Sequence, residues 1–261
     1  MSMRNATTAL TLALLVAAGC DDGPTVPRSP SGSPAAVQSL TGYYAGAGDD
    51  GKVSLSISAA ALSAPAPRAP RAGADTTQVA AYATLSRDGG GTAVLSGTYD
   101  SLADTLRLSG SGYAVRGSLA VAGPPSVFAG TFDGPAGSGA WRCLSGNAQA
   151  IAVYCGSFSS GTTTHVARWH FAAGSGVLVG TAYVAGDTTG LEVEGIASGA
   201  GAVRTLSATG GDGSRLLSVS GSLDTGTRTA SGLWSIAQGG AVIDHGSWSA
   251  VPCLDGTTSG N

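Results

Sequence analysis

The chain has 261 residues and a formal net charge of −3, and only 11% of its residues are charged, whereas glycine alone contributes 42. This length can bury the core of one or two domains, and the slight acidity argues against a nucleic-acid partner, which would need a basic surface. Without any strand pattern, so much glycine would indicate a low-complexity chain. Because alternating strand patterns recur, we interpret Gly, Ser, Thr and Asp as turn residues of an all-β protein.

The first twenty residues predict a secretory signal that ends in a lipid attachment site. One positive charge, Arg4, precedes a largely apolar run over 6–18, which is short for a bilayer span but suits the core of a signal peptide. The run ends in Ala17-Ala-Gly-Cys20, which resembles the lipobox of bacterial lipoproteins, although Leu usually stands at the place of Ala17. The resemblance implies that residues 1–19 are removed and that Cys20 carries the lipid, palmitate included. An ordinary signal peptide with a chance cysteine is the alternative.

A lipid at Cys20 predicts a location as well as a partner. Two or more acyl chains hold a protein firmly on a bilayer, so the expected partner is a membrane of the bacterial cell envelope. We favour the outer membrane. Asp21, just after the cysteine, resembles an inner-membrane retention signal of enteric bacteria, so the inner membrane, facing the periplasm, is the alternative.

Two proline-rich stretches interrupt the strand patterns. Residues 20–40 hold four prolines among Ser, Gly and Thr, which favours an extended tether. Residues 64–74, with three prolines and two arginines, are predicted to form an exposed insertion. Gly46-Ala-Gly-Asp-Asp-Gly-Lys-Val53 superficially matches phosphate-binding loops, but a strand follows it instead of a helix, so we interpret it as a turn.

The clearest strand pattern is a β-hairpin over 94–108, with its turn at Asp100–Asp104. Val53, Leu55 and Ile57 alternate with serines, which is typical of a half-buried strand. Further strands are predicted at 78–85, 92–99, 104–109, 113–119, 127–132 and 139–144.

The second half of the chain repeats the first. The hairpin pattern returns, altered, at 178–193, and three segments match in order: 106–115 with 191–200, 128–133 with 219–224, and Trp141 with Trp234. We therefore predict an internal duplication. The expected fold is all-β, with antiparallel meanders over 41–145 and 146–261 that form two small barrels or one larger sandwich or barrel.

Cysteine pairing is ambiguous from the sequence. With Cys20 taken by lipid, three cysteines remain in an oxidising compartment. We favour a Cys143–Cys155 bridge, because both flank a short turn, and Cys143–Cys253 is its rival because these two residues occupy similar ends of the two halves. No Cys-x-x-Cys pair occurs, so a zinc site has no support. We also predict no other metal site, since no calcium-loop spacing is present, and no cofactor.

No catalytic signature is present. His165 and His170 are expected on opposite faces of a strand, as are Asp244 and His245. Glu192 and Glu194 share a face and could act as a carboxylate pair, but exposed carboxylates are commoner than a glycosidase site.

Six aromatic residues could stack on a glycan or protein ligand, although we favour core positions for them: Tyr43, Tyr44, Trp141, Trp169, Trp234 and Trp248. The sequence thus predicts a lipid-anchored envelope protein with a non-enzymatic binding or structural β-domain. The alternative is a lipid-anchored hydrolase of envelope polymers with a site built from loops.

Overall fold

The computed structural model describes residues 37–46, 48–58, 78–160, 166–184 and 190–253. These residues form sixteen strands. Within the described part of the chain, no helix is long and apolar enough to cross a membrane. Cys20, the proline-rich segment 64–74 and His165 lie outside the described residues.

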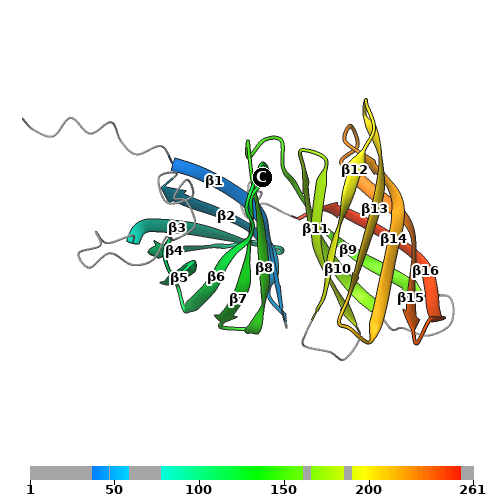
Figure 1. Cartoon of the computed structure of the whole chain (residues 1–261), viewed down its shortest axis with the longest axis horizontal. Helices are drawn as coiled ribbons and strands as arrows, with labels where there is room; N and C mark the ends of the chain where they lie inside the picture. Colours follow the sequence, from blue (N-terminus) through cyan, green and yellow to red (C-terminus); the bar gives the residue numbers. More distant parts are fainter. Residues whose placement is uncertain (1–36, 47, 59–77, 161–165, 185–189, 254–261) are drawn as a thin grey trace, which may run out of the picture. The chain divides into compact units, whose positions relative to one another are not determined.

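The first eight strands form a closed antiparallel barrel, hereafter barrel one. Each strand pairs with the next along the chain, and β8 pairs with β1 to close the ring (Figure 1). The strands are β1 (Val37–Gly46), β2 (Asp50–Ser58), β3 (Gln78–Arg87), β4 (Thr92–Asp100), β5 (Thr105–Gly110), β6 (Tyr113–Val121), β7 (Val127–Gly134) and β8 (Gly137–Ser145).

The next eight strands form barrel two with the same topology. Here β9 pairs with β10 on one side and with β16 on the other, which again closes the ring. The strands are β9 (Ala152–Ser160), β10 (Val166–Gly174), β11 (Val177–Val184), β12 (Leu191–Ser198), β13 (Val203–Gly211), β14 (Arg215–Asp224), β15 (Thr229–Gln238) and β16 (Ala241–Pro252).

This architecture confirms the all-β, antiparallel prediction and selects two small barrels over one larger one. The hairpin predicted over 94–108 is β4–β5, with its turn at residues 101–104. Strand β1 begins at Val37, within the 20–40 segment that the sequence predicts to be a tether.

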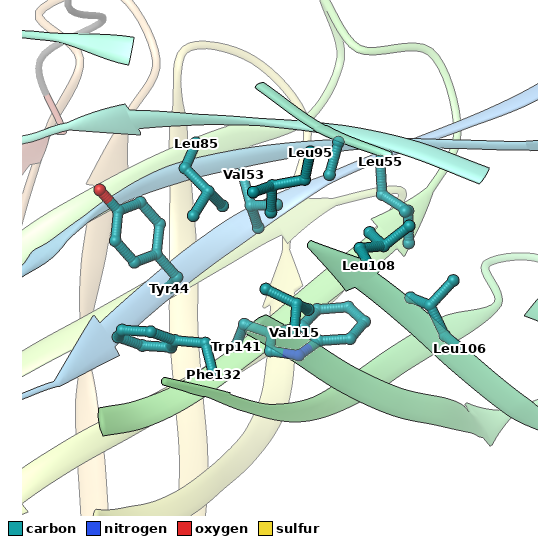
Figure 2. A pocket seen from close by; sticks show the side chains of 11 residues that line it. Tyr44, Val53, Leu55, Leu85, Leu95, Leu106, Leu108, Val115, Phe132 and Trp141 are labelled. Atoms are coloured by element: carbon teal, nitrogen blue, oxygen red, sulfur yellow. The ribbon is translucent and has the colours of Figure 1, made fainter. Parts of the chain in front are cut away.

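Barrel one is filled by its own side chains. Apolar residues at every second position point inward, as the period-2 pattern of Val53, Leu55 and Ile57 predicts. Figure 2 shows Val53 and Leu55 of β2 converging with Leu95 of β4 and Leu106 of β5 on the inside of the barrel. Eight strands enclose just enough space for such side chains or for one small ligand, and in barrel one the side chains occupy it.

A tryptophan lying across two glycines sets the register of barrel one. Trp141 on β8 is paired with Gly130 on β7, which is paired with Gly117 on β6. The Trp141 indole N–H donates to the carbonyl of Arg116, the residue before Gly117, at 3.0 Å. A Cβ at Gly117 would lie 2.4 Å from the indole ring, so only glycine fits beneath it.

Barrel two repeats this Trp-Gly-Gly arrangement on the equivalent strands. Trp248 on β16 pairs with Gly232 on β15, which pairs with Gly221 on β14. The Trp248 indole N–H donates to the carbonyl of Ser220, the residue before Gly221, at 3.0 Å. The two barrels are therefore an internal repeat in which strand n corresponds to strand n+8.

This register corrects the residue alignment predicted from the sequence. The predicted match of Trp141 with Trp234 joins β8 to β15, whereas the structural partner of Trp141 is Trp248 on β16. The segment matches 106–115 with 191–200 and 128–133 with 219–224 are out of step by the same one strand. Neighbouring strands carry the same alternation of apolar and small polar residues, so a shift by one strand preserves the pattern.

We predict that filling the space beneath either indole destabilises the fold. The Gly117→Ala and Gly221→Ala substitutions each place a Cβ within 2.8 Å of an indole or a backbone oxygen. We expect each to lower the free energy of unfolding by about 1–3 kcal/mol, the usual cost of overpacking. Urea titration followed by tryptophan fluorescence measures this.

Ser220→Ala is the matched control, because the Ser220 side chain is exposed and only its carbonyl contacts the indole. Its effect should stay within about 0.5 kcal/mol. If the glycine variants were as stable as this control, the indole would not set the register.

The outer faces of the two barrels pack against one another in a third apolar cluster. It contains Tyr43, Ala45, Val127, Leu144, Ile151, Val153, Ala172, Val179, Tyr183 and Cys253. Within it the hydroxyls of Tyr43 and Thr181 lie 2.6 Å apart, and the Tyr183 hydroxyl donates to the carbonyl of Ala45. Because hydrogen bonds satisfy these buried polar groups, the contact joins the barrels specifically.

The disulfide joins Cys155 to Cys253, so both predicted pairings, Cys143–Cys155 and Cys143–Cys253, are wrong. Cys143 points into barrel one, where it is fully buried and free, and burial raises the pKa of its thiol. Cys155 and Cys253 lie where β9 meets the end of β16, so their bridge secures the closure of barrel two. A bridge across 98 residues typically contributes about 2–4 kcal/mol.

Candidate functional site

The interior of barrel one leaves no room for a ligand. Its cavity measures about 10 Å³ and is lined by apolar and aromatic side chains such as Val53, Leu95 and Trp141. That volume is about the minimum for a single water. A binding site among the described residues must therefore lie at a barrel end or on an outer face.

Polar clusters lie at both ends of barrel one. At one end the Asp49 carboxylate accepts hydrogen bonds from Tyr44 and Tyr113, and Arg87 binds the Tyr113 hydroxyl. At the other end Asp104 accepts from the Tyr99 hydroxyl at 2.9 Å and from the Leu119 backbone N–H at 2.9 Å. Burial, together with the hydrogen bond to the Asp104 carboxylate, raises the pKa of Tyr99.

The aromatic residues considered as stacking surfaces belong to the core. All six are at most 2% exposed: Tyr43, Tyr44, Trp141, Trp169, Trp234 and Trp248. In barrel two, Trp169 contacts Phe171 in a tilted arrangement with ring centroids 4.3 Å apart, and it contacts Trp248 edge-to-face at 4.8 Å. A glycan cannot reach these rings in the folded protein, so the idea that they form a stacking surface is wrong.

Glu192 and Glu194 do share one face of β12, as predicted, but they pair with a cation from barrel one. The Arg142 side chain is only 5% exposed, and it lies 2.5 Å from a Glu192 carboxylate oxygen and 3.0 Å from one of Glu194. Burial alone would lower the pKa of Arg142, but Tyr43 and the two glutamates outweigh it and leave that pKa raised. The pair thus joins the barrels.

We predict that removing the two carboxylates costs more than removing the arginine. Glu192→Ala with Glu194→Ala strands a buried cation, which we expect to lower the free energy of unfolding by about 1–3 kcal/mol. Arg142→Met leaves two glutamates that are 68% and 63% exposed and that water can solvate, so its cost should be smaller. Thermal and urea unfolding of the variants compare the two. Equal costs, or a larger cost for Arg142→Met, would contradict this structural role.

The two histidines within the described residues, His170 and His245, lie apart. His170 is buried between the barrels, with Nε2 3.0 Å from a carboxylate oxygen of Asp50. Burial would raise the pKa of Asp50, but the hydrogen bond and charge of His170, with Arg168, outweigh it and lower that pKa. His245 is exposed on β16, whereas its neighbour Asp244 is buried and accepts from Ser160 at 2.8 Å. Asp244 and His245 thus face opposite ways, as predicted.

His170 and Asp50 line a groove of about 360 Å³ between the barrels, together with Ser157 and Ser249. This combination contains the residue types of a serine hydrolase. The second ring nitrogen of His170, Nδ1, is buried without a hydrogen bond among the described residues, so neither serine is held by it. The groove has the components of a catalytic set but not its hydrogen bonds.

A larger cavity of about 620 Å³ opens at one end of barrel two, hereafter the mouth of barrel two. Tyr154, Leu223 and Ala173 line its apolar part, and Arg204 and Arg228 line its polar part. The linker between the barrels and Lys52 of β2 border it. This volume is within the range of small-molecule sites, which makes the mouth the candidate functional site.

Tyr154 forms the floor of the mouth. Its ring stacks on Phe171 with centroids 4.9 Å apart and an interplanar angle of 14°. Burial raises the pKa of its hydroxyl, while the charges of Arg228 and Arg204 act in the opposite direction and that of Asp224 adds to the rise. Two arginines therefore act electrostatically on this hydroxyl.

The described residues contain no group of three His, Cys, Asp or Glu side chains that could hold a metal ion. Comparison with protein-family models, curated proteins and solved structures returns no significant match for this chain. The fold alone therefore defines the class: a tandem of two closed, eight-stranded, up-and-down antiparallel barrels.

Sequence reasoning did not identify the arginines of the mouth, although a local signal exists. Arg204 stands two residues before Leu206 and four before Ala208, which are both buried inward positions of β13. Strand periodicity alone therefore places an arginine at an inward position. Asp50 carried no such signal, because His170 lies 120 residues further along the chain.

Proposed function

We propose that this protein is a lipid-anchored component of the bacterial cell envelope whose tandem barrels bind a ligand without catalysis. The mouth of barrel two carries the binding part of the proposal, because it is a ligand-sized cavity, whereas the interior of barrel one is filled. The anchor part is supported by the sequence resemblance at Cys20 and by the proline-rich segment between it and β1.

The contacts between the barrels favour a preformed binding site over a mobile catalytic lid. The two barrels are joined by an apolar cluster, by the buried Arg142 with its two glutamates, and by the Asp50–His170 contact. A preorganised site loses little conformational freedom when a ligand enters. The outer membrane remains the favoured location, and the inner membrane is the alternative.

Metabolic labelling with palmitate tests the anchor. We expect the wild-type chain to incorporate label and Cys20→Ala to incorporate none, because the thiol is the attachment atom. Cys143→Ala is the matched control, since that thiol is buried in barrel one and should leave labelling unchanged. Label that persists in Cys20→Ala would exclude lipid attachment at this residue.

Protease treatment of intact cells then locates the barrels. Cleavage on whole cells would mean an outward-facing protein and an external ligand. Protection until the outer membrane is opened would mean a periplasmic protein. Fractionation of the two membranes separates the outer-membrane location from the inner-membrane alternative.

A hydrolase of envelope polymers is the second candidate. It is favoured by one observation, the presence of His170, Asp50, Ser157 and Ser249 along one groove. Its weakness is that the buried Nδ1 of His170 makes no hydrogen bond to either serine.

A fluorophosphonate probe distinguishes the two candidates, because it reacts covalently with activated serines. Under the binding proposal we expect no labelling above that of heat-denatured protein. Labelling that disappears in Ser157→Ala or Ser249→Ala, and in His170→Ala, would establish the hydrolase instead. Ser220→Ala, with its exposed side chain on β14, is the control.

A further inference from the structure

The internal repeat supplies a comparison for the mouth of barrel two. Leu106 pairs with Gly117 in barrel one, and Leu206 pairs with Gly221 in barrel two, so these residues are equivalent. Two residues before Leu106 stands Asp104, and two residues before Leu206 stands Arg204. Asp104 lies in the turn just before β5, whereas Arg204 is half-buried on β13. The corresponding positions therefore carry opposite charges in the two barrels.

The two charged side chains differ in their hydrogen-bond partners. The Asp104 carboxylate is satisfied within barrel one by the Tyr99 hydroxyl and the Leu119 backbone N–H. Arg204 makes no hydrogen bond or ion pair among the described residues, and its Nε is buried without a partner. A guanidinium at an inward position costs free energy unless an acceptor compensates for the lost water.

A second arginine increases the difference in charge between the two barrels. Arg228 lies in the β14–β15 turn, lines the same cavity and likewise has no acidic partner among the described residues. The nearby Asp224 forms no ion pair with either arginine among the described residues, and its carboxylate accepts from the backbone N–H groups of Gly226 at 2.8 Å and Thr227 at 3.1 Å. Among the described residues, the mouth is thus lined by cationic side chains, and none of its lining residues carries a carboxylate.

We propose that the mouth of barrel two binds a phosphate-bearing ligand, with Arg204 and Arg228 as the two cations that hold the phosphate. Guanidinium forks match the geometry of phosphate oxygens, and such charge-assisted hydrogen bonds are the strong ones. The apolar wall of Leu223 and Ala173 leaves space beside the phosphate for an organic part of the ligand. This inference rests on the proposed binding function of the barrels, but not on the lipid anchor.

Calorimetric titration of the full-length chain in non-ionic detergent tests the proposal. Glucose 6-phosphate is the soluble probe and glucose its uncharged counterpart. Dihexanoyl phosphatidylglycerol and dihexanoyl phosphatidylcholine form the lipid arm, which distinguishes a headgroup source from a free phosphate ester. We expect at least one of the two anionic probes to bind, and more tightly than its partner probe.

Substitutions assign the binding to the mouth. Arg204→Gln and Arg228→Asn should each weaken binding at least about tenfold, the loss expected when a charge-assisted hydrogen bond is removed. Asparagine suits position 228 because Arg228 has a φ of 56°. Arg107→Gln on the outer face of barrel one is the matched control and should bind as the wild type does. Thermal unfolding verifies that each variant is folded.

Three outcomes overturn the inference. The first is that neither anionic probe binds, and the second is that binding is unchanged in Arg204→Gln and Arg228→Asn. The third is that the probes bind, but neither anionic probe binds more tightly than its partner probe. In this third case the mouth is still a binding site, so the proposed function survives while its assignment to a phosphate fails.

Discussion

The register of each barrel depends on one contact, an indole laid across two glycines on neighbouring strands. In barrel one this is Trp141 over Gly130 and Gly117, and in barrel two it is Trp248 over Gly232 and Gly221. Slipping any of these strands by one residue would place a side chain beneath the ring and turn the inward face outward. The filled interior, the barrel ends and the outer contacts all follow from that register.

Trp169 departs from this Trp-Gly-Gly arrangement. Trp169 on β10 also lies next to a glycine, Gly156 on β9, but the next strand offers Ala250 in place of a second glycine. Its indole N–H is buried and has no partner among the described residues. Trp234, which lies next to Gly246 on β16 and then Ser160 on β9, also has a single neighbouring glycine, yet its indole N–H donates to the carbonyls of Ser247 at 3.1 Å and Ser159 at 3.2 Å. The second glycine is therefore not needed for the hydrogen bond, and its role at Gly117 and Gly221 is to leave space for the ring.

What the sequence could predict depended on whether the signal was local. The β4–β5 hairpin and the inward positions Val53 and Leu55 follow from alternation alone, and they were predicted correctly. The Cys155–Cys253 bridge depends on which strands close barrel two, and the Asp50–His170 contact depends on how the two barrels pack. Ring closure determines the first and barrel docking determines the second, and neither can be predicted from a short stretch of sequence. Arg204 is intermediate, because its inward position was visible in the pattern of β13 while its lack of a partner was not.

Ring closure also determines how the two barrels would respond to a mechanical pull. The ends of barrel two are joined covalently, since Cys155 on β9 is bonded to Cys253 after β16. Barrel one is closed by the β1–β8 hydrogen bonds alone, and its chain enters at Val37. A force applied through the residues before Val37 would peel β1 away one residue pair at a time, until it met Tyr43 and Ala45 in the inter-barrel cluster. Barrel one would then yield first and absorb the strain, while the disulfide kept barrel two closed.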